Sequence, residues 1–488
     1  MKDYGAPALM KAAGLRKKKR KAKANSLFGP PLRCNDRLKE IITRHYFLSR
    51  YAEGAKPVAW VTSGAPVEIL RPFDFYTIYP ENHGALCGAQ KVAPELCELA
   101  EERGYSQDLC SYARVDLGVC MTGKTPVGKL PKPDLLFASN NICQTVVYWY
   151  KALAHHWKIP LLLFDTPYNF RGIREGDVAY MVRQFEEMIP ELERISGKPF
   201  KEEKFQEVIR TAKETSLTWG EVLATMKARP APMTIFDAFG HLAPVVSLRG
   251  LPVALNYYRT LLSELKERVE RGVAAITNER KRLMWDNIAM WYKVRDYANL
   301  FAEHGMNFVT ATYTNAWAET TPHMDSDRPF DSMARTYSLV ILNNNLNHRL
   351  HLMESLIKEY QVDGLVIHSA RSCKPYSVGQ YDLKRLLMDR LGVPSVVIEG
   401  DITDSRAYSE EQAQAEMAVD LLDARHGFPD HGLHREVDEL CGLVSVLLPL
   451  GDVRPHLTLD VGADVLTESR PIDLVLDHLD DGPAQTGS

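Results

Sequence analysis

Two stretches of the chain show the pattern on which the fold depends: Asp134-Leu-Leu-Phe-Ala-Ser-Asn-Asn-Ile-Cys143 and Asp363-Gly-Leu-Val-Ile-His-Ser-Ala-Arg-Ser-Cys373. Each begins with a short apolar run of the kind that forms a buried strand, and each ends in a polar loop that carries a cysteine. A helical sequence follows the first loop from Gln144 onward. The two stretches therefore predict two α/β units with a cysteine in the same place in each.

Further apolar runs of similar length place each of these strands in a series. Strand candidates of the first series are residues 58–61, 75–78, 135–138 and 161–164, with helical stretches at 94–103 and 144–155. Strand candidates of the second series are residues 308–311, 364–367 and 395–398, with helical periods at 345–360 and 380–391. Strands that alternate with helices predict parallel sheets. We therefore expect an α/β protein with two Rossmann- or flavodoxin-like parallel-sheet units.

The stretch between the two series is predicted to be mainly helical. Leu261, Leu262, Leu265 and Val269 recur there at helical spacing. The predicted organisation is an N-terminal helical and basic segment (1–56), a first α/β unit (57–175), a mainly helical domain (176–306), a second α/β unit (307–412) and an atypical C-terminal tail (413–488). The tail is acidic near its end and closes in a Gly-, Pro- and Ser-containing stretch, a composition typical of disorder.

The composition is that of an ordinary globular protein. The 488 residues are 45% hydrophobic and 25% charged, with a formal net charge of −4. This balance gives no support for a nucleic-acid or anionic-membrane partner, and we interpret the basic run Arg16–Lys21 as a solvated helix face or frayed terminus. Apolar stretches are too short to span a bilayer, and the N-terminus lacks the apolar segment of a secretory signal. We expect a cytoplasmic protein that binds neither nucleic acid nor membranes.

Eight cysteines are too few for a disulfide scaffold in a chain of this length, and no two of them form a C-x-x-C pair. Any metal site must therefore be assembled from distant parts of the chain. Cys143 and Cys373 lie in loops at strand ends, where α/β folds build their sites, and Cys110 lies at a predicted helix start. The positive end of a helix stabilises a thiolate. From the residues alone, a shared metal site and three inert thiols both remain open.

One segment matches the letters of a phosphate-binding P-loop, G-x-x-x-x-G-K-[ST]: Gly118-Val-Cys-Met-Thr-Gly-Lys-Thr125. Such a loop cradles phosphates only where a strand enters it and a helix leaves it. Residues 111–117 instead indicate a helix or turn, and three prolines between residues 126 and 133 prevent a helix from starting there. We interpret the segment as a lysine-bearing surface loop.

Five phrases lie at intervals along the chain: Tyr79-Pro-Glu-Asn-His-Gly-Ala85, Cys110-Ser-Tyr-Ala-Arg114, Asn140-Asn-Ile-Cys143, His368-Ser-Ala-Arg-Ser-Cys-Lys-Pro-Tyr-Ser377 and Val393-Pro-Ser-Val-Val-Ile-Glu-Gly-Asp401. Together, and in this order, they resemble the family of benzoyl-CoA reductase and 2-hydroxyacyl-CoA dehydratase subunits. The resemblance runs from about residue 57 to about residue 412. The first two phrases are most similar to the larger, cluster-bearing subunit of ATP-dependent aryl-CoA reductases.

The resemblance implies a cofactor and its ligands. In the family, three cysteines from different loops bind one [4Fe–4S] cluster, and the matching positions here are Cys110, Cys143 and Cys373. A cluster held by three cysteines keeps one iron open to substrate, whereas an electron-carrying cluster usually has four thiolates. Cys87 is the next candidate for a ligand, and the remaining cysteines are interpreted as packing residues.

Two residues of the first phrase, Glu81 and His83, are our candidates for catalytic proton donors, because they follow a strand-like segment in a polar context. A helix cap or a hydrogen-bonded loop pair is the structural alternative. Arg371 and Lys374 flank Cys373, where they would contact CoA phosphates, tune the cluster through their charge, or remain plain surface charges.

The resemblance also implies partners and a reaction. Members pair with a second, related cluster-bearing subunit, and a separate ATP-hydrolysing activator, with a low-potential ferredoxin upstream, delivers the electrons. We expect reduction of an aryl-CoA, such as benzoyl-CoA, to a cyclic diene acyl-CoA. Removal of water from a 2-hydroxyacyl-CoA on the same scaffold is the alternative. A non-catalytic iron–sulfur electron carrier and a structural zinc protein are further alternatives.

The resemblance ends near Ser409-Glu-Glu-Gln-Ala-Gln414. Where the family continues into an amphipathic C-terminal helix, this chain has unfamiliar sequence from Ala415 to Ser488. A shifted reading frame and a lineage-specific extension both explain such a break.

Overall fold

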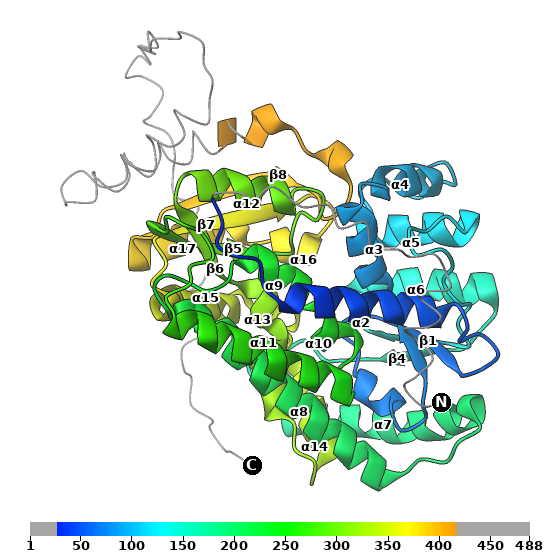
Figure 1. The fold of residues 1–488 in the computed structure, drawn as a ribbon. Helices are drawn as coiled ribbons and strands as arrows, with labels where there is room; N and C mark the ends of the chain where they lie inside the picture. Colours follow the sequence, from blue (N-terminus) through cyan, green and yellow to red (C-terminus); the bar gives the residue numbers. More distant parts are fainter. Residues whose placement is uncertain (1–26, 414, 417–488) are drawn as a thin grey trace, which may run out of the picture. The chain divides into compact units, whose positions relative to one another are not determined.

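Two parallel four-stranded sheets form the framework of the protein (Figure 1). The computed structural model describes residues 27–413, 415 and 416, so the predicted basic run and almost all of the predicted tail lie outside the described residues. The first sheet has the strand order β2-β1-β3-β4 and the second has the order β6-β5-β7-β8. The predicted α/β fold with two parallel-sheet units is confirmed.

The helices and strands have the following bounds. The strands are β1 (Val58–Val61), β2 (Tyr76–Ile78), β3 (Leu135–Ser139), β4 (Leu161–Phe164), β5 (Lys281–Asp286), β6 (Met306–Ala311), β7 (Gly364–Ala370) and β8 (Ser395–Gly400). The helices are α2 (Cys34–Ser49), α3 (Pro80–Ala89), α4 (Ala93–Glu101), α5 (Ser111–Thr122), α6 (Gln144–Trp157), α7 (Glu175–Ser196), α8 (Glu202–Ala224), α9 (Ile235–His241), α10 (Ala243–Ser247), α11 (Pro252–Glu270), α12 (Val294–Glu303), α13 (Thr312–Thr320), α14 (Pro329–Ser338), α15 (Leu346–Tyr360), α16 (Lys374–Ser377) and α17 (Gln380–Leu391). Short 3-10 helices lie at η1 (Val67–Leu70), η2 (Thr225–Lys227), η3 (Thr321–His323), η4 (Ile341–Asn343) and η5 (Ser405–Ala407). Within the part of the chain that the structure describes, no helix is long and apolar enough to cross a membrane, and the cytoplasmic location stays a prediction.

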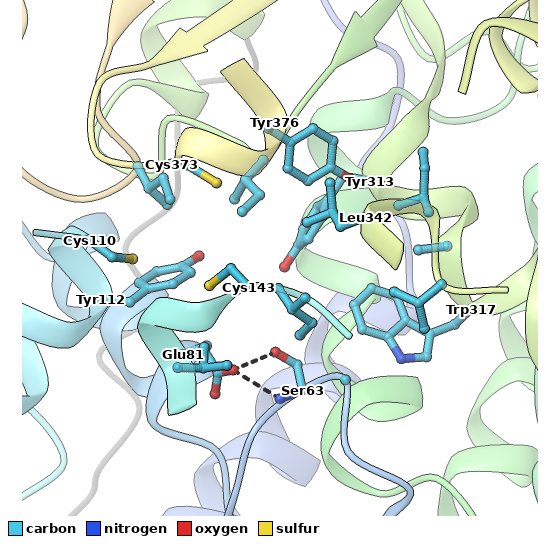
Figure 2. A pocket seen from close by; sticks show the side chains of 18 of the residues that line it. Ser63, Glu81, Cys110, Tyr112, Cys143, Tyr313, Trp317, Leu342, Cys373 and Tyr376 are labelled. Atoms are coloured by element: carbon cyan, nitrogen blue, oxygen red, sulfur yellow. Dashed lines mark hydrogen bonds between the residues drawn. The ribbon is translucent and has the colours of Figure 1, made fainter. Parts of the chain in front are cut away.

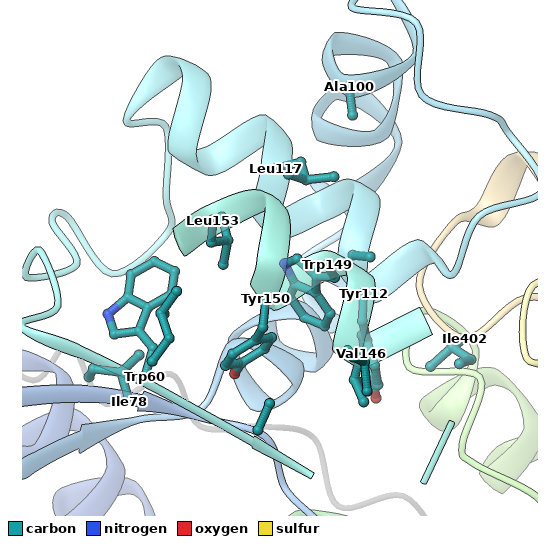
Figure 3. Packing of buried hydrophobic residues seen from close by; sticks show 14 of the residues in the cluster. Trp60, Ile78, Ala100, Tyr112, Leu117, Val146, Trp149, Tyr150, Leu153 and Ile402 are labelled. Atoms are coloured by element: carbon teal, nitrogen blue, oxygen red, sulfur yellow. The ribbon is translucent and has the colours of Figure 1, made fainter. Parts of the chain in front are cut away.

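The first sheet and helices α5 and α6 enclose an apolar core (Figure 3). Trp60 of β1 and Ile78 of β2 belong to the same buried cluster as Trp149 and Tyr150 of α6. Strands covered on both faces need such continuous apolar sequence, which is why the apolar runs predicted them. Ile402, which follows β8, also belongs to this cluster, so the two α/β units share part of one core.

Each sheet reverses its strand order at a comparable place. β1 lies between β2 and β3, and β5 lies between β6 and β7. At such a point the loops from the carboxyl ends of neighbouring strands part to opposite faces of the sheet and leave a crevice between them. The cysteine loops after β3 and β7 therefore lie at the positions where parallel α/β sheets bind their ligands.

Strand β5 lies inside the range 176–306, which was predicted to be mainly helical. Its sequence, Lys281-Arg-Leu-Met-Trp-Asp286, carries a fully buried arginine in a central strand. Arg282 donates to the Glu279 carboxylate at 2.7 Å and to the Tyr360 carbonyl oxygen at 2.8 Å. Burial of a charge is tolerated only with such partners, and a hydrophobicity pattern cannot foresee them. The second sheet therefore begins at β5, and the other predicted domain boundaries stay predictions.

The P-loop match is not a phosphate-binding loop. Gly118 lies inside α5, and Gly123 ends that helix with the left-handed φ of +70° that favours glycine. Lys124 forms an ion pair with Glu95. Because a helix enters the segment where a P-loop needs a strand, the prediction of a surface loop is confirmed.

A chain of hydrogen bonds joins the first α/β unit to the second. The Ser111 backbone N–H donates to Ser372 Oγ at 3.1 Å, and the Ser372 hydroxyl donates to Asp401. The Asp404 N–H donates to the other oxygen of Asp401 at 3.0 Å, and Asp404 pairs with Arg114 at 2.8 Å. Each of these groups is buried, so the contacts hold the loop of Cys110 beside the loop of Cys373.

A second buried ion pair connects the helical segment to the first sheet. Glu68 is 0% exposed and Arg249 is 1% exposed, and Nε of Arg249 lies 2.6 Å from the Glu68 carboxylate. The Tyr337 hydroxyl donates to the second Glu68 oxygen at 2.6 Å and accepts from Arg249 at 2.9 Å. The carboxylate therefore has partners at both oxygens.

Replacement of Glu68 should reveal how much this pair contributes. Glu68→Gln keeps the side-chain shape but leaves the buried Arg249 charge without its carboxylate. We expect the free energy of unfolding, measured with urea, to fall by about 3 kcal/mol. Glu53→Gln removes the partner of the exposed Lys129 and should change it by less than about 1 kcal/mol. Equal effects of the two changes would contradict the role given to the buried pair.

Candidate functional site

Three cysteines from three different loops line one cavity of about 120 Å³, which we call the thiol cavity (Figure 2). Cys110 directly precedes α5, Cys143 directly precedes α6 and Cys373 directly precedes α16. Figure 2 shows their sulfur atoms pointing toward a common space. The structure therefore brings together the three cysteines that were predicted from distant parts of the sequence.

The position before each helix gives every thiol a backbone donor. The Ala113 N–H donates to Cys110, and the Tyr376 N–H donates to Cys373. Cys143 accepts from the backbone of the first turn of α6 and from the Thr145 hydroxyl. These bonds favour the thiolate form, as is usual for cysteines at helix N-termini.

Burial acts in the opposite direction and is the stronger effect. It raises the pKa of Cys373 to about 12, with a further contribution from the neighbouring Cys143 thiol. It also raises the pKa of Cys110 well above its usual range, and both other thiols add to this shift. Three thiolates in one buried place repel one another, so their ionised form requires a compensating positive charge.

The arrangement fits an iron–sulfur cluster better than a single ion. Within residues 27–413, 415 and 416, no group of three or more His, Cys, Asp or Glu side chains is arranged to hold a metal ion. In a [4Fe–4S] cluster each thiolate binds a different iron, so the ligands surround a space instead of converging on one point. The three thiols face the thiol cavity in this manner and have N–H donors in place, which is the donor set that such a cluster needs.

Glu81 is the carboxylate of the thiol cavity. It lies in the first turn of α3, and its Oε1 accepts from the Ser63 backbone N–H and from the Ser63 hydroxyl, both at 3.0 Å. Its Oε2 is buried without a hydrogen-bond partner. Burial raises the pKa of Glu81, so the side chain retains a proton more readily than an exposed glutamate does.

His83 was predicted together with Glu81, but the two side chains point to different places. His83 is not among the residues that line the thiol cavity. Its Nε2 lies 2.7 Å from Thr125 Oγ1, and its ring lies 3.8 Å from the Cys87 sulfur. Residues two apart on a helix face nearly opposite directions, so α3 presents only Glu81 to the thiols. Burial lowers the pKa of His83 to about 4.

The other predicted ligands and charges lie elsewhere. Cys87 packs in a buried apolar cluster with Leu96 and Val115 and does not line the thiol cavity. Arg371 pairs with Glu399 at 2.9 Å, and Lys374 donates to the Arg371 carbonyl oxygen. Of the cysteines interpreted as packing residues, Cys34 and Cys97 are buried and Cys120 is half-buried, while Cys441 lies outside the described residues.

Several aromatic side chains of the thiol cavity were not predicted. They are Tyr112, Trp149, Tyr313, Trp317 and Tyr376. Tyr112 and Tyr376 follow Cys110 and Cys373 within the quoted phrases, so their position beside a predicted ligand was an available signal. Tyr313 and Trp317 lie four residues apart on α13 and come from a part of the chain with no motif. Arg249 also lines the cavity, and no sequence signal points to it.

A model of the protein family described as "2-hydroxyglutaryl-CoA dehydratase, D-component" matches residues 62–419. The chain is 34% identical over 378 residues to the (R)-2-hydroxyisocaproyl-CoA dehydratase alpha subunit of Clostridioides difficile, which covers 76% of this chain and 92% of that protein. It is 33% identical over 362 residues to the (R)-phenyllactyl-CoA dehydratase alpha subunit of Clostridium sporogenes, covering 74% of this chain and 88% of that protein. It is 31% identical over 390 residues to a benzoyl-CoA reductase subunit of Thauera aromatica, covering 76% and 90%. The chain belongs to this family, as its five phrases predicted.

A second buried acid lies next to the site and gives a prediction on pH. Asp116 of α5 is fully buried and accepts from the Trp149 indole N–H at 2.8 Å. Burial raises the pKa of Asp116 to about 8, whereas an aspartate in the unfolded chain titrates near pH 4. As pH rises between these values, the unfolded chain loses the proton and the folded protein keeps it, so the folded protein loses stability.

Asp116→Asn removes this titration and can keep the bond to Trp149. We therefore expect its free energy of unfolding, relative to the unmodified protein, to rise with pH by up to about 1.4 kcal/mol per pH unit. Urea unfolding at pH 5, 6, 7 and 8 measures the difference. The exposed Asp36→Asn on α2 is the control. A pH-independent difference between Asp116→Asn and the unmodified protein would show that Asp116 is ionised in the folded state.

Proposed function

We propose that this chain is the catalytic, cluster-bearing subunit of an enzyme that removes water from a 2-hydroxyacyl-CoA. The observation that carries the proposal is the meeting of Cys110, Cys143 and Cys373 at the strand-order reversals of both sheets, around one apolar cavity that also contains Glu81. The names of the dehydratase alpha subunits at 33% and 34% identity support this choice of reaction. Aryl-CoA reduction, our first expectation from the phrases, is not singled out by the comparisons and becomes the second candidate.

Each part of the site has a proposed task. Cys110, Cys143 and Cys373 would hold a [4Fe–4S] cluster, which supplies a low-potential electron donor and an open iron beside the thioester. Glu81 would hold a proton at Oε2 and exchange it with substrate, because that oxygen is buried and without a partner. Ser63 orients Glu81 through its two bonds to Oε1. The aromatic walls keep water out and hold the acyl group.

The lining of the thiol cavity indicates the kind of acyl group. Trp149, Trp317, Tyr313 and Leu342 contribute mostly apolar surface. An apolar cavity of about 150 Å³ holds a benzene ring, and the thiol cavity has about 120 Å³. We propose an apolar or aryl acyl group of about this size, and not a dicarboxylic acid.

Partners follow from the same proposal. The name of each relative describes it as one subunit of an enzyme, so we propose that this chain pairs with a second, related subunit. An ATP-hydrolysing activator supplied by a low-potential ferredoxin would deliver the electrons. The failed P-loop agrees with this division, since the described part of the chain offers no P-loop of its own at Gly118–Thr125.

Aryl-CoA reduction is the second candidate, supported by the identity to a benzoyl-CoA reductase subunit and by the aromatic walls. The two reactions differ in electron demand. Dehydration has no net redox change, whereas reduction of an aryl ring to a cyclic diene consumes two electrons and two protons per ring. Anaerobic assays with a limiting amount of a one-electron reductant distinguish them: many turnovers per electron indicate dehydration, and two electrons per product indicate reduction.

Removal of single cysteines tests the cluster. After anaerobic co-expression with the partner subunit, we expect about four irons per chain and their loss in Cys110→Ala, Cys143→Ala and Cys373→Ala. Cys87→Ala is the control and should keep its iron, because Cys87 packs away from the cavity. Loss of iron in Cys87→Ala would favour a four-thiolate electron carrier. Zinc in place of iron and sulfide would favour the structural-metal alternative.

Replacement of Glu81 tests the proton transfer. Glu81→Gln keeps the shape and the acceptor for Ser63 but removes the carboxyl proton, so we expect product formation to fall by about 100-fold or more with unchanged iron content. His83→Gln should have a smaller effect on the rate, because His83 does not line the thiol cavity. A larger loss in His83→Gln at full iron content would restore His83 as the proton donor.

A further inference from the structure

A second cavity, of about 310 Å³, lies beside helix α2. Helices α2, α3, α9 and α10 supply most of its wall, and we call it the α2 cavity (Figure 1). Its surface is mainly apolar, with Leu38, Ile42 and Leu86 among the lining residues. Asn35, Lys39 and Asn82 add polar groups. A mostly apolar cavity with a few placed polar groups is the usual form of a binding site for a small organic ligand.

The α2 cavity and the thiol cavity share a wall. Tyr313 lines both of them. Trp291 lines the α2 cavity, and its indole N–H donates at 2.6 Å to the hydroxyl of Tyr112, which lines the thiol cavity. The ring of Phe239 lies 6.2 Å from Tyr313 and 6.1 Å from Trp291. Side chains alone therefore separate the two cavities, and rotation of an aromatic side chain is enough to join them.

The small volume of the thiol cavity requires such an exit. Its 120 Å³ can hold an acyl group but not the long arm that connects a thioester to the nucleotide of coenzyme A. When the acyl group lies beside the thiols, the arm must leave through neighbouring space. The α2 cavity adjoins the thiol cavity and has more than twice its volume.

We propose that the α2 cavity binds the pantetheine arm of the acyl-CoA substrate, with the thioester at Tyr313. The inference rests on the proposed acyl-CoA function. The arm alternates apolar segments with two amides, which matches apolar walls that carry the amide side chains of Asn35 and Asn82. The Asn82 amide is held in place by its 2.7 Å bond to Ser247. Lys39 is exposed at this cavity and provides a positive charge for the phosphates.

The polar cavity on the other side of the cysteine loops is a poorer route. It is lined by Arg114, Arg371, Asp401, Asp404 and Arg406, and it shares no lining residue with the thiol cavity. Its arginines already pair with carboxylates: Arg371 with Glu399, and both Arg114 and Arg406 with Asp404. The bonded chain from Ser111 through Ser372 to Asp401 closes the space between this cavity and the thiols.

Two neighbouring residues of α2 provide a matched test. Ile42 lines the α2 cavity, whereas Thr43 lines neither cavity, and both are half-buried. Ile42→Trp fills the α2 cavity, so the dissociation constant for free coenzyme A, measured by calorimetry on the full chain, should rise by about tenfold or more. Thr43→Trp should leave it within about twofold. The melting temperature of each variant verifies folding.

A second variant keeps the test decisive if Ile42→Trp does not fold. Ala89→Trp enters the α2 cavity from the exposed end of α3 and should weaken coenzyme A binding in the same way. Coenzyme A should also protect Lys39 from acetylation, detected by mass spectrometry, without protecting Lys129, which pairs with Glu53.

The outcomes separate the inference from the function on which it rests. If coenzyme A binds the unmodified protein and the cavity-filling variants equally well, the arm does not occupy the α2 cavity, and the acyl-CoA function survives. If the unmodified protein does not bind coenzyme A at all, the acyl-CoA function fails and the inference fails with it. Calorimetry requires no cluster, so cluster loss cannot produce either result.

Discussion

The site depends on one constraint: the loops of Cys110 and Cys143 come from one α/β unit and the loop of Cys373 comes from the other. The hydrogen bonds from Ser111 to Ser372 and onward to Asp401 set the distance between two of these loops. Buried polar groups of this kind add little net stability, because desolvation offsets most of the attraction between them. Their contribution is geometric, since a chain in which every member has a partner is satisfied in only one arrangement of the two units.

Buried charge around the site follows the same logic. Arg249 has Glu68, and Arg349 has Asp286, so most buried ions near the cysteine loops are paired. Glu81 and Asp116 are different, because burial raises the pKa of each and their hydrogen bonds come from the neutral donors of Ser63 and Trp149 instead of a cation. An acid held in this way is a local cost in stability, and such costs concentrate where a protein uses the group. The thiols face the same low-dielectric space, which strengthens every electrostatic interaction in it.

Much of the architecture could be predicted because its signals are local. Strands β1, β3 and β4 are short apolar runs bounded by turn residues, and parallel strands covered on both faces leave no other sequence pattern. Strand β5 escaped prediction because Arg282 interrupts its apolar run, and the partners that neutralise this arginine include a group distant in sequence. His83 was grouped with Glu81 because the two are neighbours in one phrase, yet the turn of α3 sends their side chains to different surroundings.

The sequence by itself determined the α/β class, the family and the identity of the three cysteine loops, because each is written in contiguous residues. Only the tertiary structure decided that the three loops meet, since their meeting depends on where two sheets reverse their strand order. It also decided which residues enclose the site: Tyr313, Trp317 and Arg249 come from segments without a motif, and α2 reaches the substrate side from a distant part of the chain. Side-chain surroundings arise from packing between distant segments, and no local pattern records them.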